Sequence, residues 1–415
     1  MVDTIIVGGG ICGLALALNL HARGLPSRVY ERSQTIRELG VGITLLPHAM
    51  RELDALGLGP AMLAAGIETR ESAFFNRFGQ AIYREPRGRL AGYPVPEVGI
   101  SRGRLHSILH QAVLDRLGPD SVLSDHECVD VDNDAEGATA IFRSASEGAE
   151  LPPVRGAVVV ACDGVNSAVR RKLVPDDAIA FTGIHMWRGV TRRPPILDGR
   201  TYMRVGSIRT GKMVIYPIAD LPNGEQLINW VAEIQRDGPA TADWNRTGRR
   251  EDFAPVFESW RFPWLDVADL IRDAETVLEY PMVDKDPLER WTVGRVTLAG
   301  DAAHPMYPRG SNGSAQSLID ARVLADKLAA SPDAPGDALV AYEAERRPAT
   351  SRVVRTNREQ PPDFINIKVE DLVGDRPFER LEDHISQEEL KALSDGYKAV
   401  AGYALTDLHA TARSA

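Results

Sequence analysis

Three glycines near the N-terminus have a spacing that can bind a phosphate group. Gly8, Gly10 and Gly13 follow a short apolar run, Thr4 to Val7, and precede a stretch with leucines at helical spacing. In a strand, turn and helix of this kind, the first glycine allows the tight turn. The second lets a pyrophosphate approach the backbone, and the third lets the helix pack close to the sheet. Because the helix N-terminus also offers free N–H groups, the spacing predicts a dinucleotide site.

An acidic residue stands where such a site needs one. The next apolar strand, Arg28 to Tyr30, ends at Glu31. Glu31 lies about 20 residues past the glycines, where a carboxylate can accept hydrogen bonds from a ribose. The glycines alone could form a plain surface turn. The strand, the helix and the acid together favour the dinucleotide interpretation.

A second strand-to-helix junction occurs in the middle of the chain, in the segment ACDGVNSAVR. The apolar strand Ala157 to Cys162 leads into Asp163, and a helix begins near Ser167 and carries Arg170. This junction would place Asp163 and Arg170 at the carboxyl edge of a parallel sheet, where ligands bind. The alternative is a simple helix cap with an exposed basic face.

A third junction follows late in the chain, in GDAAHPMYPRGSNGSAQ. Strand Arg295 to Leu298 leads to Asp301, a glycine-punctuated loop follows, and a helix begins near Ser314. The positive end of that helix, with the Asn312 and Gly313 amides beside it, could stabilise a negative charge on a bound group.

Composition limits the class of protein. The chain has 415 residues, 44% of them hydrophobic, and a net charge of -10 without a dense Lys/Arg cluster. These features argue against nucleic acid as a partner, and no apolar run approaches the roughly 20 residues that span a membrane. The chain begins directly with a strand, so we expect no leader peptide and a cytoplasmic protein. Cys12, Cys128 and Cys162 show no C-x-x-C pairing, which predicts reduced structural thiols and no metal site.

The remaining elements predict an α/β protein with an inserted sheet. Short alternating segments from Glu71 to Tyr93 and from Phe181 to about Val277 predict antiparallel strands, and the stretch Arg102 to Leu117 predicts a helix. We expect a discontinuous dinucleotide-binding domain of residues 1–70, 100–180 and 278–350. A substrate-binding β-sheet domain would comprise 71–99 and 181–277, and a helical segment 351–415.

The three junctions in this order, GGGICG, ACDGVNSAVR and GDAAHPMYPRGSNG, resemble the fingerprints of the single-component flavoprotein aromatic hydroxylases. That family includes p-hydroxybenzoate hydroxylase and salicylate hydroxylase, and the resemblance covers residues 1 to about 350. The segments MWRGV, YPMVDKDPL and MYPRGSNGSAQ further resemble phenazine-modifying members. The resemblance implies a Rossmann-like FAD-binding domain of the p-hydroxybenzoate hydroxylase type, an inserted antiparallel sheet and a C-terminal helical region.

The resemblance also implies how FAD is held. The first glycines would bind its pyrophosphate, Glu31 the adenosine ribose, Val129 the adenine through its backbone, and Asp301 the ribityl or pyrophosphate part. The implied cofactor-binding residues are Gly8, Gly10, Gly13, Glu31, Arg32, Arg102, Val129, Asp163, Asp301, Gly310, Asn312 and Gly313. We expect the FAD to be non-covalent, because Cys12 in the glycine turn is better explained as a small apolar filler.

For the substrate we predict a planar, possibly fused-ring and carboxylated aromatic. It would lie between the inserted sheet and the loop from Asp301 to Gly313, here called the late loop. The predicted contacts are Trp187, Tyr216 and Trp230 on the sheet and Pro308 and Arg309 on the loop. For any single one of these aromatics a place in the core is the favoured alternative, and a solvated Arg309 is at least as well supported. We expect no obligatory protein nucleophile, and His304 is predicted to stabilise the loop.

The implied reaction uses NADH or NADPH and O2. The nicotinamide reduces the flavin, oxygen adds at the flavin C4a carbon, and the distal oxygen hydroxylates the ring, possibly with decarboxylation. No nicotinamide-binding domain is visible, so we expect transient binding near Asp163 and Arg170. Alternatives are another FAD reaction on the same fold, such as Baeyer–Villiger oxygenation, epoxidation or dehydrogenation, and a flavin sensor without turnover. The protein is predicted to be a monomer or a homodimer.

Overall fold

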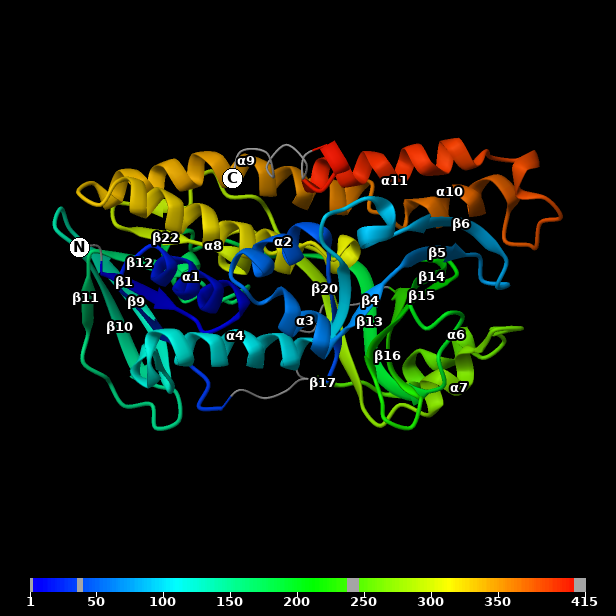
Figure 1. Ribbon diagram of the computed structural model, residues 1–415, viewed down its shortest axis with the longest axis horizontal. Coiled ribbons are helices and arrows are strands. Elements are labelled where there is room, and N and C mark those ends of the chain that lie inside the picture. The colour runs from blue at the N-terminus through cyan, green and yellow to red at the C-terminus, as the bar shows by residue number, and fades with distance from the viewer. Residues whose placement is uncertain (1–2, 36–39, 237–245, 407–415) are drawn as a thin grey trace.

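The computed structural model describes residues 3–35, 40–236 and 246–406, and it has two halves (Figure 1). The half around the N-terminus contains a six-stranded sheet in the order β21-β22-β12-β1-β2-β8. Its parallel strands are β1 (Thr4–Val7), β2 (Ser27–Tyr30), β8 (Val122–Leu123), β12 (Val158–Ala161) and β22 (Val296–Leu298), while β21 (Thr292–Val293) pairs antiparallel with β22. Strands β1, β12 and β22 are buried along their whole length, as expected for parallel strands covered on both faces.

Three helices of this half follow the three predicted junctions, namely α1 (Ile11–Ala22), α5 (Ala168–Leu173) and α8 (Gly313–Ala330). Helix α4 (Arg102–Leu117) belongs to the same half and packs on α1. Helices α2 (Pro47–Ala55) and α3 (Gly59–Ala65) lie between the halves in Figure 1, near the small sheet β3 (Gly42–Leu45), β7 (Glu97–Ser101) and β4 (Ile67–Thr69). A second small sheet contains β9 (His126–Asn133), β10 (Ala138–Ser144) and β11 (Val154–Gly156).

The other half is an eight-stranded sheet in the order β17-β20-β13-β16-β15-β14-β5-β6. Its strands are β5 (Glu71–Phe75), β6 (Ala81–Pro86), β13 (Ile179–Arg193), β14 (Thr201–Ser207), β15 (Gly211–Asp220), β16 (Gln226–Gln235), β17 (Arg246–Thr247) and β20 (Val277–Lys285). Neighbours are antiparallel except for β14 on β5.

The two faces of this sheet pack against different parts of the protein. Side chains on one face, here called the outer face, form a cluster with α6 (Ala254–Phe257), α7 (Val267–Arg272) and the hairpin β18 (Arg261–Phe262) and β19 (Leu265–Asp266). The inner face forms another cluster, which includes Tyr307 from the late loop. Because side chains alternate along a strand, each residue's parity decides which cluster it joins.

Three C-terminal helices, α9 (Pro335–Glu359), α10 (Phe364–Val373) and α11 (Gln387–Ala401), lie along one side of the molecule, above both halves in Figure 1. Helix α9 packs on α8, and α10 packs on β14 and β5. The last nine residues of the predicted helical segment, 407–415, lie outside the described residues.

One predicted domain boundary is wrong. Residues 278–285 were assigned to the dinucleotide-binding domain, but they belong to β20, which pairs with β13 in the eight-stranded sheet. The longer of the two segments that form this sheet begins with β13 and ends with β20, so a boundary at residue 277 cuts β20 at its first residue.

Candidate functional site

Glycine suits positions 8, 10 and 13 for three different steric reasons. Gly8 has φ of 101°, and a Cβ there would lie 2.5 Å from the carbonyl oxygen of Cys162. A Cβ at Gly13 would lie 2.0 Å from the carbonyl oxygen of Gly8, which confines this position to glycine. A Cβ at Gly10 would meet nothing within 4 Å. The absence of a side chain at Gly10 therefore leaves open space at the helix N-terminus, and this space fits a pyrophosphate.

Glu31 lies beside the glycine turn, as predicted from its spacing. Its carboxylate accepts hydrogen bonds from the amides of Gly9 and Ser33, both at 2.7 Å. Each carboxylate oxygen keeps a second lone pair for a further donor such as a ribose hydroxyl. A cavity of about 290 Å³ opens here, lined by Gly9, Glu31, Ser33, Gln34, Thr35, His110, Val122 and Ser124. The place and polarity of this cavity fit the adenosine part of a dinucleotide.

Helix α4 supports the same turn through a residue that sequence reasoning missed. The Nε2 of His106 lies 2.6 Å from the carbonyl oxygen of Gly9. No local sequence pattern marks this contact, because His106 and Gly9 are 97 positions apart in the sequence. The side chains of Arg102 and Arg32 are exposed.

Val129 falls at an irregularity of the small sheet. Ile141 of β10 pairs with Asp130, and the next residue, Phe142, pairs with Cys128, so Val129 has no partner on β10. Val129 is also 41% exposed. A bulge of this kind frees backbone groups, which fits the predicted backbone contact with adenine.

At the middle junction the two predicted residues differ in their environment. The Oδ2 atom of Asp163 accepts a hydrogen bond from the Ala168 amide at 2.9 Å, but Oδ1 is buried without a partner. Burial raises the pKa of Asp163. An unpaired buried oxygen at a predicted ligand site is consistent with a hydroxyl donor from the cofactor.

Arg170 is not available to a transient nicotinamide. It is completely buried, and its guanidinium donates to both carboxylate oxygens of Asp177 at 2.8 Å. It also donates to the carbonyl oxygens of Ala302 and Ala303. The sequence places an arginine at this edge, but this arginine ties α5 to the late loop instead of facing a ligand.

Asp320 of α8, which was not predicted from the sequence, contacts the residues that begin the late loop. Its carboxylate accepts hydrogen bonds from the Gly300 amide at 3.0 Å and from Arg346 Nε at 2.7 Å, and it also contacts His304 Nε2. Burial would raise the pKa of Asp320, but the neighbouring His304 and Arg346 lower it to about 2. A charged residue between apolar residues of a buried helix face was a usable signal for such a network.

The N-terminus of α8 has no side-chain cap. Asn312 occupies the N-cap position, yet its side chain makes no capping hydrogen bond. The Ser314 Oγ atom is buried without a partner, and Asp301, which is exposed, places Oδ1 3.8 Å from a Cβ built at Gly313. A partly anionic group with hydrogen-bonding edges, such as a flavin, fits free amides and an unpaired hydroxyl.

The predicted aromatic contacts lie on opposite faces of the eight-stranded sheet. Trp187 and Trp230 lie in the outer-face cluster, where Trp187 stacks on Phe253 with ring centroids 5.0 Å apart. Tyr216 lies on the inner face and stacks on Tyr202 at 5.0 Å. Parity separates them, because Trp230 alternates with the inner-face residues of β16. The two tryptophans are thus core residues beneath α6 and α7.

The two arginines near the inner face differ in their partners. Arg309, the predicted carboxylate ligand, donates to Asp363 at 2.8 Å, while its neighbour Pro308 is exposed. Arg204 was missed by sequence reasoning. It is 4% exposed, and its guanidinium lies 4.5 Å from the Tyr202 ring centroid and 4.9 Å from that of Phe74.

Other features limit the chemistry of the site. Cys12 is buried, and the neighbouring Cys162 thiol together with burial raises the pKa of Cys12, so it is a poor nucleophile. No cluster of His, Cys, Asp and Glu that could hold a metal occurs among the described residues. In the same part of the chain, no helix is long and apolar enough to span a membrane.

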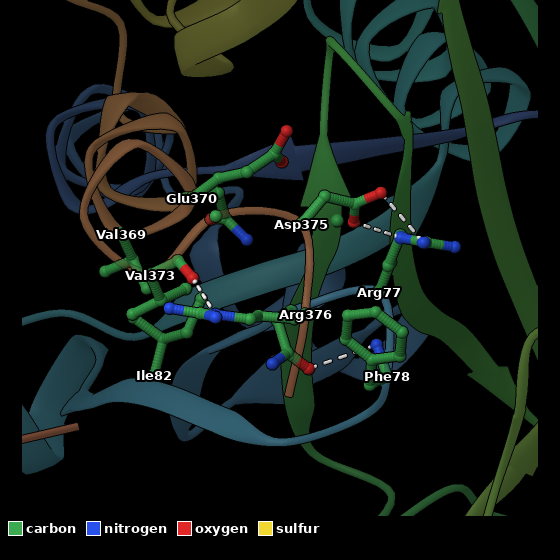
Figure 2. Close-up of a pocket in the computed structure, with 12 residues that line it drawn as sticks. Arg77, Phe78, Ile82, Val369, Glu370, Val373, Asp375 and Arg376 are labelled. Atoms are coloured by element: carbon green, nitrogen blue, oxygen red, sulfur yellow. Dashed lines mark hydrogen bonds and ion pairs between the residues drawn. The ribbon is translucent and has the colours of Figure 1, made fainter. Parts of the chain in front are cut away.

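A separate cavity lies between the β5–β6 turn and the C-terminal end of α10 (Figure 2). Its volume is about 20 Å³, and Ile82, Val369 and Val373 contribute apolar walls while Arg77 pairs with Asp375. This volume holds about one water molecule and excludes an aromatic ring.

Known proteins resemble this chain over most of its length. A family described as FAD binding domain matches residues 1–357. The phenazine 1,6-dicarboxylic acid hydroxylase PhzS of Lysobacter antibioticus is 41% identical over 86% of this chain and 89% of its own. A 3-amino-4-hydroxybenzoate 2-monooxygenase of Streptomyces platensis is 34% identical over 91% and 90%. The structure of Klebsiella pneumoniae HpxO with FAD and uric acid shares the fold, with a TM-score of 0.75 at 23% identity, over 98% of this chain and 97% of that protein.

Proposed function

This chain belongs to the family of single-component FAD-dependent aromatic hydroxylases, and from that premise we propose that its substrate is a planar, carboxylated, fused-ring aromatic. The protein is an FAD-dependent monooxygenase that acts on an aromatic compound. The proposal adds where the substrate lies and which group recognises its charge. The ring would lie against Tyr202 and Tyr216 on the inner face, with its carboxylate on Arg204.

The observation that carries this proposal is the environment of Arg204. Its Nη1 donates to Ser72 Oγ at 2.9 Å, and no carboxylate among the described residues forms an ion pair with it. Burial raises the pKa of Glu97, and the nearby Arg204 opposes this rise, so Glu97 attracts Arg204 from beyond ion-pair distance. A buried guanidinium without a carboxylate in direct contact is costly, and a substrate carboxylate would offset that cost. Arginine also binds carboxylates in a bidentate geometry that fixes their orientation.

The aromatic stack beside Arg204 supports a flat substrate. Tyr202 and Tyr216 are stacked at an interplanar angle of 18°, and both are buried. Such rings offer a flat apolar surface for a further ring, typically worth about 0.5–1.5 kcal/mol beyond area burial. The 41% identical relative is named for a dicarboxylated three-ring substrate, which agrees in shape and charge.

On the cofactor side, we propose that the turn at Gly10 and the α1 amides bind the FAD pyrophosphate, with Glu31 on the adenosine ribose. The N-terminus of α8 would then bind the isoalloxazine ring, with Asp301 on the ribityl side. FAD held by these residues would supply the redox chemistry that connects NADH or NADPH to O2. The protein's residues position the substrate ring, exclude water from the inner face and stabilise the developing negative charge at α8.

The test is binding of phenazine-1,6-dicarboxylic acid, 3-amino-4-hydroxybenzoate and 3-hydroxybenzoate, followed by the flavin spectrum and by NAD(P)H consumption. For the ligand that turns over, Arg204→Met should weaken binding about 10- to 150-fold, the loss expected for a charge-assisted contact. The corresponding amide should bind wild type and variant equally.

Trp230→Phe is the matched control, because this large ring lies on the outer face of the same sheet. It should leave the KM and the yield of hydroxylated product unchanged. Equal affinity of wild type and Arg204→Met for every carboxylated substrate would remove Arg204 from the site. An effect of Trp230→Phe as large as that of Arg204→Met would place the substrate elsewhere.

A further inference from the structure

A continuous chain of hydrogen bonds ties the late loop to the C-terminal helices. His48 Nε2 donates to Asn312 Oδ1 at 2.9 Å, and Asn312 Nδ2 donates to the Tyr397 hydroxyl at 2.8 Å. Tyr397 in turn donates to Asn357 Oδ1 at 2.6 Å, and Asn357 Nδ2 donates to the Tyr307 carbonyl at 3.2 Å. This series of hydrogen bonds thus begins at His48 in α2 and reaches Asn312 in the late loop. It continues through Tyr397 of α11 and Asn357 of α9 and ends at Tyr307, at the start of the same loop.

The direction of every donor in this chain is fixed by its neighbours. Burial lowers the pKa of His48 to about 3, so its ring is neutral at physiological pH. The Asn312 amide nitrogen already serves Gly310 and Tyr397, so only its oxygen can accept from His48. The Tyr397 hydroxyl therefore both accepts and donates, and phenylalanine could do neither.

Tyr397 also explains a glycine of the loop. A Cβ at Gly310 would lie 1.5 Å from the Tyr397 hydroxyl oxygen and 2.4 Å from the ring carbon that carries it. Gly310 has no positive φ, so its backbone conformation does not require glycine. Glycine is needed there because the side chain of Tyr397, in helix α11, occupies the space that a Cβ would fill.

The orientation of Asn312 has a consequence for helix α8. An asparagine at an N-cap usually accepts a hydrogen bond from the first helical turn. Here the Asn312 side chain points to His48 and Tyr397 and makes no capping bond. The first-turn amides of α8 are left for a ligand, and Tyr397 is the contact from α11 that holds Asn312 in this orientation.

We propose that Tyr397 is a positioning residue for the flavin reaction, because it holds Asn312 and Gly310 so that the α8 N-terminus faces the isoalloxazine ring. This inference rests on the proposed placement of that ring beside residues 307–313. It gives the C-terminal helical segment a part in the chemistry, although none of its residues needs to touch the substrate.

The experiment is Tyr397→Phe in the FAD-loaded, full-length protein. Less exact alignment of the α8 amides should weaken the stabilisation of the reduced flavin. At a fixed potential, the ratio of reduced to oxidised flavin should fall about two- to fivefold, the range expected for loss of a helix-end interaction. The flavin absorption maximum should shift, and more of the NAD(P)H oxidised should end as hydrogen peroxide instead of hydroxylated product.

Tyr93→Phe is the matched control. Tyr93 is buried in the same cluster of Tyr93, Tyr397 and Tyr403, and its hydroxyl donates to the Tyr403 carbonyl at 2.7 Å. It ties the C-terminal segment to the β6–β7 connection, and among the described residues its hydroxyl makes no hydrogen bond to residues 307–313. A merely structural role for Tyr397 predicts the same loss of thermal stability in both variants and an unchanged flavin potential in both, and this result would overturn the proposal.

Two further variants separate the inference from its premise. Asn357→Leu removes the acceptor for Tyr397 and should reproduce the change in potential, which covers the case in which Tyr397→Phe does not fold. Asn312→Ala tests the placement of the ring directly. If Asn312→Ala alters the flavin spectrum and potential while Tyr397→Phe and Asn357→Leu do not, the placement holds and the inference about Tyr397 is wrong. If none of the three alters them, the placement itself is wrong.

Discussion

His48 should make a large contribution to the loss of stability of this protein in mild acid. His48 is completely buried, and burial lowers its pKa to about 3, with Arg51 and Arg346 lowering it further against the opposing effect of Asn312. In an unfolded chain a histidine has a pKa of about 6.5. Between these two values the unfolded state binds a proton that the folded state does not, so the free energy of unfolding falls as the pH falls.

The magnitude follows from the two pKa values. The effect is nearly absent at pH 7, grows by about 1.4 kcal/mol per pH unit below about pH 6.5 and reaches about 2 kcal/mol at pH 5. His48→Gln keeps a donor for Asn312 but removes this titration. It also removes the stacking of His48 on Tyr403, whose rings lie 4.8 Å apart, which should cost about 1 kcal/mol at every pH.

The assay is urea unfolding at pH 7, 6 and 5 for the wild type, His48→Gln and His21→Gln. The exposed His21 is the control, and His110 and His185, whose pKa values are also lowered by burial, add the same acid loss to all three proteins. The variant should be less stable than the wild type at pH 7 and as stable or more stable at pH 5. A stability difference that stays constant from pH 7 to pH 5 would refute the argument that His48 is neutral and buried.

Two further predictions concern the cofactor turn and the network beneath the late loop. Gly10→Val should give colourless protein whose cofactor-free stability is unchanged, because a Cβ there meets only open space, whereas Gly13→Ala should also lower the thermal stability of the cofactor-free protein. Arg346→Gln should lower the free energy of unfolding by about 3–5 kcal/mol in urea, since it leaves Asp320 buried without that counter-ion. Arg347→Gln, which changes a half-buried pair with Glu343, should change it by less than about 0.5 kcal/mol.

Local sequence signals predicted the cofactor side of the fold well because they act over short distances. The turn at Gly8 to Gly13 and its helix depend on neighbours within a few residues, and the predicted helix Arg102–Leu117 has the same bounds in the structure. Glu31 could be placed because a short strand fixes its distance from the turn. The prediction that Arg170 faces a ligand was wrong, because the packing of α5 places its guanidinium against Asp177.

The residues of the substrate-binding sheet could not be assigned to a face from the sequence, because that assignment depends on tertiary contacts. Trp230 and Tyr216 both stand in alternating strands, but the sequence does not say which parity faces the cofactor, and the aromatic content alone pointed to both. Only the position of α6 and α7 settles that the tryptophan face is the outer one.

The same limit decides which arginine can recognise a substrate. Arg204 and Arg309 are both flanked by apolar or small residues in the sequence, and either could serve a carboxylate. Arg309 is neutralised by Asp363, a residue 54 positions later that also pairs with Lys212 at 3.0 Å. Arg204 is instead flanked by two aromatic rings and a serine hydroxyl, without an ion-pair partner among the described residues. The C-terminal segment supplies Asp363, which neutralises Arg309, and this leaves Arg204 as the arginine that we propose for the substrate carboxylate. The same segment also contacts the loop through Tyr397.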